Sequence, residues 1–374
     1  MRMGVLDIGS NTVRLVIAET DGAVPLPVHT AKRQLRLSDH VERGGRLPPE
    51  QVARLVEAVA DARDEGRRWG VTRPFAFATA IVRDAPNRLD ILDRVAADTG
   101  VRLHVLPGEV EAELTFLAAR RWMGWRAGPL ALLDIGGGTL EVAFGRSRLP
   151  DFAISLPLGA ARMTREFLRG QDPPSAHRTR LLRRHVRHQL RDVAARIRWE
   201  APRTAVATSR TFQQLGRLCG AAPGRSGPFT ERVMTRADLG SAVERLAALP
   251  AAGRAGLPGI SAARSGQSLA GAIVAHTSMK LMGVDEVVIC PWALREGVLL
   301  RCIEDGNADW WDGTAPVIRE WSASPRALRR VTADDQSGAA VPAQVPAPVP
   351  AVVPAPVTPA GHRPRGPGLF TERT

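Results

Sequence analysis

The chain of 374 residues has no tyrosine and few lysines or cysteines. Its cysteines, Cys219, Cys290 and Cys302, are odd in number and form no CxxC pair, which argues against a disulfide framework and against a zinc site. The only lysines are Lys32 and Lys280, so a P-loop lysine is not available, and no GxGxxG motif follows a strand pattern. These absences disfavour P-loop NTPases and Rossmann oxidoreductases.

Long apolar runs are also missing. No segment approaches the roughly 18 consecutive apolar residues of a membrane span, and Asp7 interrupts the N-terminal apolar stretch before a signal-peptide core could form. We therefore expect a cytoplasmic protein without a membrane partner. A content of 44% hydrophobic and 24% charged residues is typical of a globular chain, and the length suffices for two domains.

Positive charge is in excess, with 51 basic against 38 acidic residues and a net charge of +13. This excess favours a polyanionic substrate or partner, although the arginine bias also reflects a GC-rich bacterial genome. Residues 162–203 hold twelve arginines and four acids, and an apolar stripe predicts a helix that turns many of them to solvent. We predict a polyanion track there, formed by Arg183, Arg184, Arg187 and Arg191. Nonspecific nucleic-acid contact and a merely solvated face are the alternatives; nucleic acid is not expected, because aromatic residues and nucleic-acid motifs are missing.

Short apolar runs alternate with helical patterns, which predicts an α/β fold. We expect strands at 3–8, 13–17, 75–78, 101–106, 130–135 and 141–144, helices at 49–69, 88–98, 109–123, 175–199 and 235–249, and a strand-to-helix passage at 286–303. Proline recurs at every second or third position through 341–359, so residues 322–374 are predicted to be a disordered tail.

A short internal repeat is the strongest local signal. Residues 6–12, LDIGSNT, recur 127 positions later as residues 133–139, LDIGGGT, with five of seven identities. Each copy lies between two strand-like runs, which predicts a duplicated hairpin in two similar domains. Small turn residues leave backbone N–H groups open to an oxyanion, and a strand-end aspartate repels phosphate unless a divalent cation lies between them. Asp7 and Asp134 therefore predict phosphate and Mg²⁺ binding, with an ordinary turn as the alternative for either copy alone.

Six ordered blocks resemble the family of exopolyphosphatases and guanosine pentaphosphate phosphatases, Ppx/GppA, of the actin-like superfamily. The blocks are residues 5–12, 78–87, 108–112, 133–141, 155–160 and 293–299. The resemblance implies two ribonuclease-H-like α/β domains around an active-site cleft, as in the short members of the family. Domain I would span 1–123 and take in helix 293–305, domain II would span 124–305, and 306–374 would be a linker and the disordered Pro-rich tail.

The resemblance also implies roles for individual residues. Glu111 matches the catalytic carboxylate, and Asp7, Asp134 and Glu141 match acids that hold Mg²⁺ or Mn²⁺. The implied activity is hydrolysis of the terminal phosphoanhydride of inorganic polyphosphate, by metal-assisted attack of water and with release of orthophosphate. The alternatives are removal of the 5′-phosphate of guanosine pentaphosphate (pppGpp) and a non-catalytic polyphosphate or alarmone sensor; a homodimer is left open. The positions that match phosphate contacts are Ser10, Asn11, Thr12, Thr79, Arg83, Gly136, Gly137, Gly138 and Thr139.

Three residues depart from the family pattern: Val110, Leu140 and Arg210 stand where a second acid, a serine or threonine, and a glycine are usual. A side chain at Arg210 blocks close approach of a ligand to the backbone but could itself contact a phosphate. We therefore add Arg210 to the polyanion track and expect the polymer rather than the nucleotide as substrate. The departures motivate the sensor alternative, whereas the retained acids argue against it.

Overall fold

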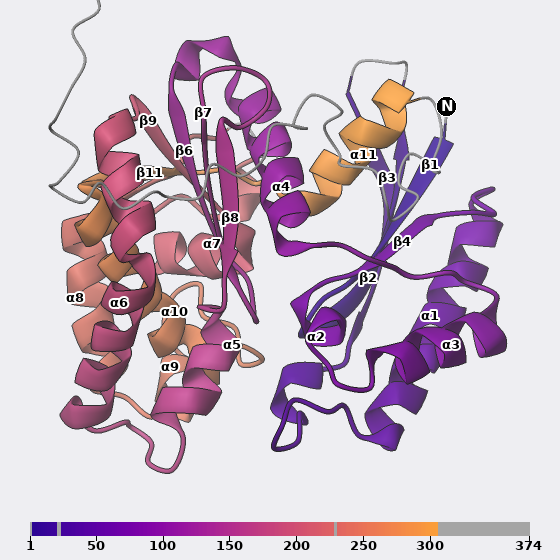
Figure 1. Cartoon of the computed structure of the whole chain (residues 1–374), viewed down its shortest axis with the longest axis horizontal. Helices are drawn as coiled ribbons and strands as arrows, with labels where there is room; N and C mark the ends of the chain where they lie inside the picture. Colours follow the sequence, from indigo (N-terminus) through magenta and orange to yellow (C-terminus); the bar gives the residue numbers. More distant parts are fainter. Residues whose placement is uncertain (1, 21–23, 228–229, 306–374) are drawn as a thin grey trace, which may run out of the picture. The chain divides into compact units, whose positions relative to one another are not determined.

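The computed structural model describes residues 2–20, 24–227 and 230–305, which form two β-sheets with helices packed on them (Figure 1). All of these residues belong to one compact unit, residues 1–321. The predicted Pro-rich tail lies outside the described residues. No described helix is long and apolar enough to span a bilayer.

The first sheet has the strand order β3-β2-β1-β4-β5. Within it β1 pairs antiparallel with β2 and parallel with β4. Helices α1 and α3 cover one face of this sheet, and α1 begins with a proline in its first turn, where the missing N–H costs nothing. The elements are β1 (Arg2–Ile8), β2 (Thr12–Glu19), β3 (Leu26–Gln34), α1 (Pro49–Arg68), β4 (Phe75–Ala78), α2 (Ala80–Arg83), α3 (Arg88–Thr99) and β5 (His104–Val105).

The second sheet has the order β10-β11-β9-β6-β7-β8, and its β6–β7 hairpin repeats the arrangement of β1 and β2. Helices α6, α7, α8 and α10 share one core with one face of this sheet. The elements are β6 (Leu130–Ile135), β7 (Leu140–Gly145), β8 (Phe152–Leu156), α5 (Ala160–Met163), α6 (Ala176–Glu200), β9 (Thr204–Thr208), α7 (Ser209–Leu218), β10 (Val233–Thr235), α8 (Arg236–Ala247), α9 (Ala251–Arg254), α10 (Ser265–Met282) and β11 (Glu286–Ile289).

Helix α4 (Gly108–Met123) packs on both sheets. Val110 and Leu114 belong to the core of the first sheet. Ala112 and Phe116 belong to the core on that face of the second sheet which lies opposite α6, α7, α8 and α10. Every residue from Val110 to Arg120 is buried, so this helix has no solvent-facing side over that length. An acidic residue on this stretch is therefore held inside the molecule.

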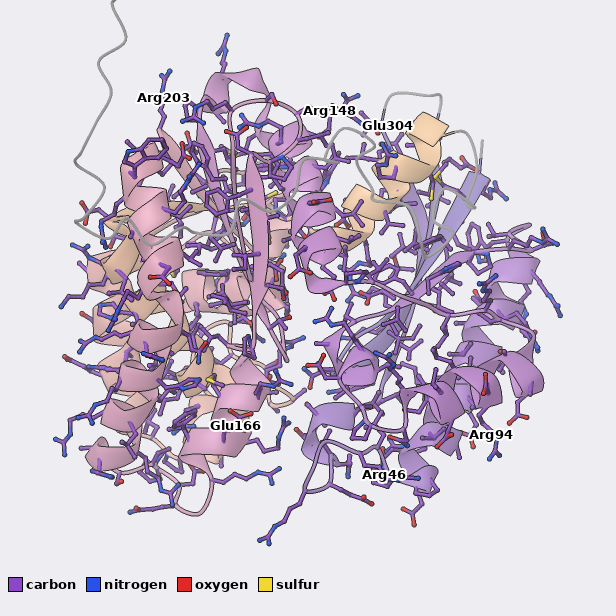
Figure 2. All side chains as sticks on the ribbon, viewed as in Figure 1. Arg46, Arg94, Arg148, Glu166, Arg203 and Glu304 are labelled. Carbon is purple, nitrogen blue, oxygen red and sulfur yellow. The ribbon has the colours of Figure 1, made fainter. Side chains whose placement is uncertain are left out.

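Helix α11 (Leu294–Asp305) returns to the first sheet and packs against α4. Val298 and Leu299 lie in the same core as Val110 and Leu114 of α4. An ion pair between Arg148, in the β7–β8 turn, and Glu304 ties the end of α11 to the second sheet (Figure 2).

The predicted elements are present, but several others were not predicted. Strands β3, β8, β9 and β10 and helices α7 and α10 were missed, and β5 covers only two of the six residues expected. Helix α10 is buried almost all round, and its apolar residues follow no helical period, so the pattern that marks an amphipathic helix is missing.

The contact between α4 and α11 depends on a glycine. A Cβ at Gly297 would lie 2.0 Å from the Leu114 backbone oxygen, which cannot move aside as a side chain can. We expect Gly297→Ala to lower the free energy of unfolding by about 2–3 kcal/mol. Gly266→Ala, in α10, meets nothing within 4 Å and should stabilise the protein by about 0.5 kcal/mol. Denaturant unfolding of both variants checks this, and equal effects would contradict the close contact.

Candidate functional site

The two repeated hairpins have the same turn and meet at their tips. The Gly9 N–H donates to the Thr12 carbonyl at 3.0 Å, and the Gly136 N–H donates to the Thr139 carbonyl at 2.9 Å. A Cβ at Gly137 would lie 2.6 Å from the Cβ of Ser10. Glycine is thus required for the two turns to approach each other this closely. The predicted phosphate-binding turns come together.

A cleft opens beside these turns. Its lining includes Ser10, Gly137 and Gly138, together with Asp84 and Arg162. Asp84 comes from the half of the chain that holds the first sheet and Arg162 from the half that holds the second, and the two form an ion pair of 2.8 Å. The cleft continues, by way of Ser38 and Arg165, into a cavity of about 330 Å³ whose other basic lining residues are Arg36 and Arg169.

The strand carboxylates all face α4. Residues of a strand alternate between its two faces, and Asp7 falls on the same face of β1 as Met3 and Val5, which pack against α4. Asp134 and Glu141 are opposite each other in the β6–β7 pair and fall on the face of that sheet that α4 covers. Glu111 comes from the first turn of α4 itself. Four acids from four elements, β1, β6, β7 and α4, therefore converge in one buried region.

Burial and nearby negative charge raise the pKa values of three of these acids, Asp134, Glu141 and Glu111. Burial raises the pKa of Asp134 to about 6, and burial together with the charge of Asp134 raises that of Glu141 to about 8. The pKa of Glu111 is also raised well above its ordinary value, first by burial and then by Glu141, although Arg83 opposes the shift.

Only two of the four acids have a cationic partner among the described residues. Arg83 forms an ion pair with Glu111, and the Arg295 Nη1 donates to Asp7 Oδ2 at 3.0 Å. Asp134 and Glu141 face neutral hydroxyl groups instead: Thr208 donates to Asp134, and Ser155 donates to Glu141 at 2.8 Å. No described cation forms an ion pair with this second pair of acids, although Arg295 and Arg83 partly oppose the rise in the pKa values of Asp134 and Glu141, respectively.

The partners of the four acids indicate which of them could bind a metal ion. Across residues 2–20, 24–227 and 230–305, no three acidic, histidine or cysteine side chains form a ready-made metal cage. Mg²⁺ needs less than that, because it commonly takes one or two carboxylates and fills its other positions with water and substrate phosphate. Asp134 and Glu141 fit such a site, whereas Asp7 is already paired with Arg295.

The other residues with a predicted phosphate contact lie at or beside the hairpin tips. The Thr79 hydroxyl donates to the Ile8 carbonyl at 3.4 Å, and Asn11 accepts from Gln267 at 3.4 Å. The Thr139 hydroxyl bonds to Glu141. Thr12 begins β2 and Gly136 follows β6.

A second group of cations was not predicted. Arg14, Lys32 and Arg264 lie near Arg210 and Arg295, and burial together with this crowding lowers the pKa of Arg264 to about 10. In the described chain none of Arg14, Lys32, Arg210 and Arg264 forms an ion pair, and the buried Nε of Arg14 has no hydrogen-bond partner. One signal was available: Arg14 holds, in the first repeat, the position that Glu141 holds in the second. Crowded cations of this kind would be stabilised by an anion between them.

Comparison with known proteins agrees with this geometry. The sequence profile of the Ppx/GppA phosphatase family matches residues 15–305. The chain belongs to the Ppx/GppA phosphatase family. It is 70% identical over 320 residues to an uncharacterized protein of Streptomyces coelicolor, covering 85% of this chain and 94% of that one. It is 44% identical over 319 residues to exopolyphosphatase 1 of Mycobacterium tuberculosis, covering 85% and 91%.

The solved structures agree in fold. The Aquifex aeolicus member of the Ppx/GppA family matches with a TM-score of 0.70 and 25% identity, over 82% of this chain and 99% of that one. An exopolyphosphatase from Cytophaga hutchinsonii matches with a TM-score of 0.75 and 21% identity, over the same shares. These matches confirm the actin-like α/β fold expected from the family resemblance. Membership of a phosphatase family also confirms that the protein is a hydrolase.

Two of the three departures from the Ppx/GppA pattern do not reach the site. Val110 packs in the core of the first sheet, and Leu140 packs in the core of the second, on the face away from α4. Arg210 is the exception, because it lies among the unpaired cations beside Arg264.

The residues of the predicted polyanion track do not stay together. Arg184, Arg187 and Arg191 line one groove on α6. Arg183 is not among the lining residues, and its buried Nε has no hydrogen-bond partner. Arg210 belongs to the separate group of cations at the start of α7.

A buried acid next to the site provides a test of the electrostatics. Burial raises the pKa of Glu113 on α4 to about 7, above its ordinary 4.5, so ionised Glu113 is unfavourable in the folded protein. The stability that protonated Glu113 gives is present below pH 4.5 and is lost as the pH rises through 7. We expect the free energy of unfolding of Glu113→Gln, relative to that of the wild type, to rise by about 2–3 kcal/mol between pH 5 and pH 8.

Denaturant unfolding at the two pH values measures this difference. The exposed residue Glu50 gives a control, since Glu50→Gln should change stability equally at both. A Glu113→Gln effect that does not depend on pH would show that the Glu113 carboxyl is not desolvated as described.

Proposed function

We propose that this Ppx/GppA protein is an exopolyphosphatase, which hydrolyses the terminal phosphoanhydride of inorganic polyphosphate and releases orthophosphate. The main support is the buried Glu111–Arg83 pair beside two further acids, Asp134 and Glu141, that form no ion pair in the described chain. The group of unpaired cations around Arg264 adds to it, because a chain of phosphates needs several positive contacts in a row. The relative of 44% identity named exopolyphosphatase 1 agrees with this function.

In the proposed reaction, Glu111 is the general base. A buried carboxylate with a raised pKa is a stronger base near neutral pH than an exposed one. It accepts a proton from water as the water oxygen bonds to the terminal phosphorus, and the bond to the bridging oxygen breaks, so that the shortened chain leaves with that oxygen. The N–H groups at the tips of the two turns, at residues 10–11 and 137–138, hold the phosphoryl oxygens, and Arg83 and Arg295 stabilise their charge.

Asp134 and Glu141 are the residues that would hold Mg²⁺ or Mn²⁺. The ion, when bound, supplies positive charge to the oxygens of the transferred phosphoryl group. Its binding would also offset the repulsion between the two carboxylates that raises their pKa values. Asp7 would hold Arg295 in position rather than bind the metal.

The polymer is favoured over guanosine pentaphosphate by the lining of the cleft. The two cavities beside the hairpin tips, as far as the structure describes them, have no aromatic side chain on which a guanine ring could stack. Four cations that form no ion pair in the described chain, by contrast, suit a ligand that is anionic along its length: Arg14, Lys32, Arg210 and Arg264.

Removal of the base tests the proposed chemistry. Glu111→Gln should lower kcat for polyphosphate by at least about 100-fold, because general-base catalysis contributes that much or more. Glu113→Gln makes the same substitution two residues along the same helix, outside the carboxylate group, and should keep most of the activity. Phosphate release from long-chain polyphosphate measures both. Undiminished activity of Glu111→Gln would refute its role as base, and equal losses in the two variants would point to damage to α4 instead.

Metal dependence tests the assignment of the acids. Chelation with EDTA should abolish phosphate release, and added Mg²⁺ or Mn²⁺ should restore it. Asp134→Asn should raise the Mg²⁺ concentration for half-maximal activity by at least about tenfold, the effect of roughly 1.4 kcal/mol of lost binding energy. Asp7→Asn should shift this concentration much less, since Asp7 pairs with Arg295. A larger shift for Asp7→Asn than for Asp134→Asn would contradict the assignment.

A further inference from the structure

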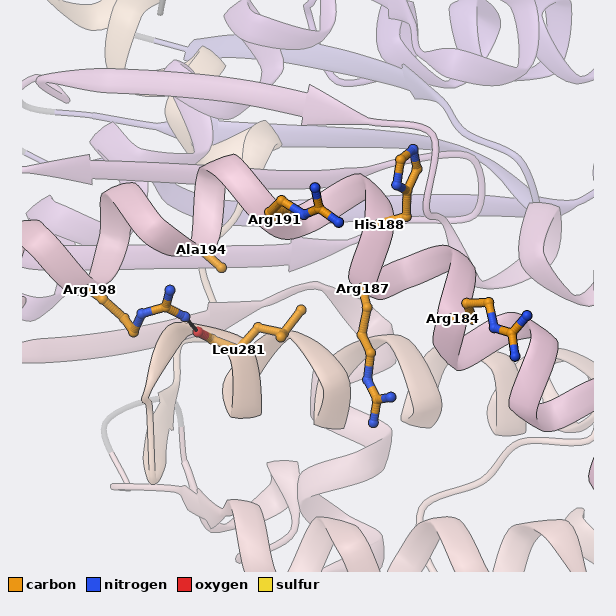
Figure 3. Close-up of a pocket in the computed structure, with 7 residues that line it drawn as sticks. All are labelled: Arg184, Arg187, His188, Arg191, Ala194, Arg198 and Leu281. Carbon is orange, nitrogen blue, oxygen red and sulfur yellow. Dashed lines mark hydrogen bonds between the residues drawn. The ribbon is translucent and has the colours of Figure 1, made fainter. Parts of the chain in front are cut away.

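A basic groove lies between α6 and the end of α10 (Figure 3). It has a volume of about 390 Å³. The arginines on it follow one another along a single side of the helix at spacings of three, four and seven residues. The lining residues are Arg184, Arg187, His188, Arg191, Ala194, Arg198 and Leu281.

The charge of this groove is not neutralised within the described chain. Arg184, Arg187 and Arg191 form no ion pair with any described acid, and Arg198 donates to the Leu281 carbonyl. Asp192, the one acid between Arg184 and Arg198 in the sequence, does not line the groove.

Some arginines elsewhere form ion pairs, whereas others, such as the exposed Arg73, Arg88 and Arg102, form none with a described acid. On the same helix, Arg196 pairs with Glu200 at 2.5 Å, and on α3 Arg94 pairs with Asp98 at 2.7 Å. Arg184, Arg187 and Arg191 are distinguished from these by lining the same groove.

The groove is separate from the catalytic region. Helix α6 packs in the core on one face of the second sheet, with Leu133 and Ile135. Helix α4, which carries Glu111, packs on the opposite face, with Leu130 and Leu132. A sheet and a layer of helices, each about 10 Å thick, thus lie between the groove and the proposed base.

We propose that this groove binds the body of a long polyphosphate chain whose end is hydrolysed at the Glu111 site; the inference rests on the proposed function. Arg184 and Arg191 are seven residues apart, or about 10 Å along a helix, so the arginines of the groove are spread along two turns of α6. Arginine binds phosphate oxygens through two parallel hydrogen bonds. His188 contributes the one ring among the lining residues and no Phe, Trp or Tyr lines the groove, so it lacks the series of large stacking surfaces typical of single-stranded nucleic-acid sites.

The test compares the triple variant Arg184→Gln, Arg187→Gln and Arg191→Gln with a control of equal charge change. The control is Arg73→Gln, Arg88→Gln and Arg102→Gln, three exposed arginines of the first sheet's half of the chain. Binding of long-chain polyphosphate is measured in EDTA over a range of salt concentrations, with a single-stranded RNA as a second ligand. KM is then measured with Mg²⁺ for long-chain polyphosphate and for tripolyphosphate.

The groove variant should bind long-chain polyphosphate at least about tenfold more weakly, with the slope of log affinity against log salt shallower by about 2, as expected for three lost phosphate contacts. Its KM should rise for the long chain and stay unchanged for tripolyphosphate, which is too short to reach both sites. Equal affinities of the groove and control variants, or a loss of affinity confined to RNA, would overturn the proposal. Failure of the proposed function would look different: wild-type protein would bind polyphosphate in EDTA yet release no phosphate with Mg²⁺.

Discussion

The insertion of one helix between two sheets is the constraint on which the site depends. Helix α4 packs on both sheets, and its residues from Val110 to Arg120 are all buried and mostly apolar or small. Glu111 lies within this stretch, and burying a carboxylate is costly unless it is paired. Arg83 supplies the partner, and the close approach of α11 at Gly297 closes the packing from the other side. The position of the acid is thus fixed by the same contacts that hold the two halves of the chain together.

The charges of the site are unbalanced in a way that suits a phosphate polymer and a metal ion. Two acids, Asp134 and Glu141, have only hydroxyl partners, while the cations around Arg264 have no acidic partner in the described part of the chain. The two acids repel each other and the cations repel one another, which contributes to the raised pKa of Glu141 and the lowered pKa of Arg264. A divalent cation beside the acids and phosphates beside the arginines would relieve both repulsions. Charges that repel one another in the free protein are expected at a site that binds ligands of opposite charge.

The hairpins could be predicted from sequence because their determinants are local. The repeat of residues 6–12 at 133–139 gives the turn, and alternation along β1 and β6 puts Asp7 and Asp134 on the faces that α4 covers. Helix α10 was missed because it is buried on nearly all sides and has no amphipathic period. The group around Arg264 was missed for another reason: its members come from β2, β3, α7 and the start of α10, and only the tertiary fold brings them together. The roles given to individual residues stay predictions until variants are measured.

The proposed function depends most directly on which substrate the wild-type protein cleaves. Orthophosphate release should be measured with Mg²⁺ for long-chain polyphosphate and for guanosine pentaphosphate under identical conditions. The account predicts a kcat/KM for polyphosphate at least about tenfold higher, equivalent to roughly 1.4 kcal/mol of extra transition-state stabilisation from the added cation contacts. A higher value for the nucleotide would contradict the choice of substrate. Tight binding of polyphosphate without release at any Mg²⁺ or Mn²⁺ concentration would contradict the enzyme and favour a sensor.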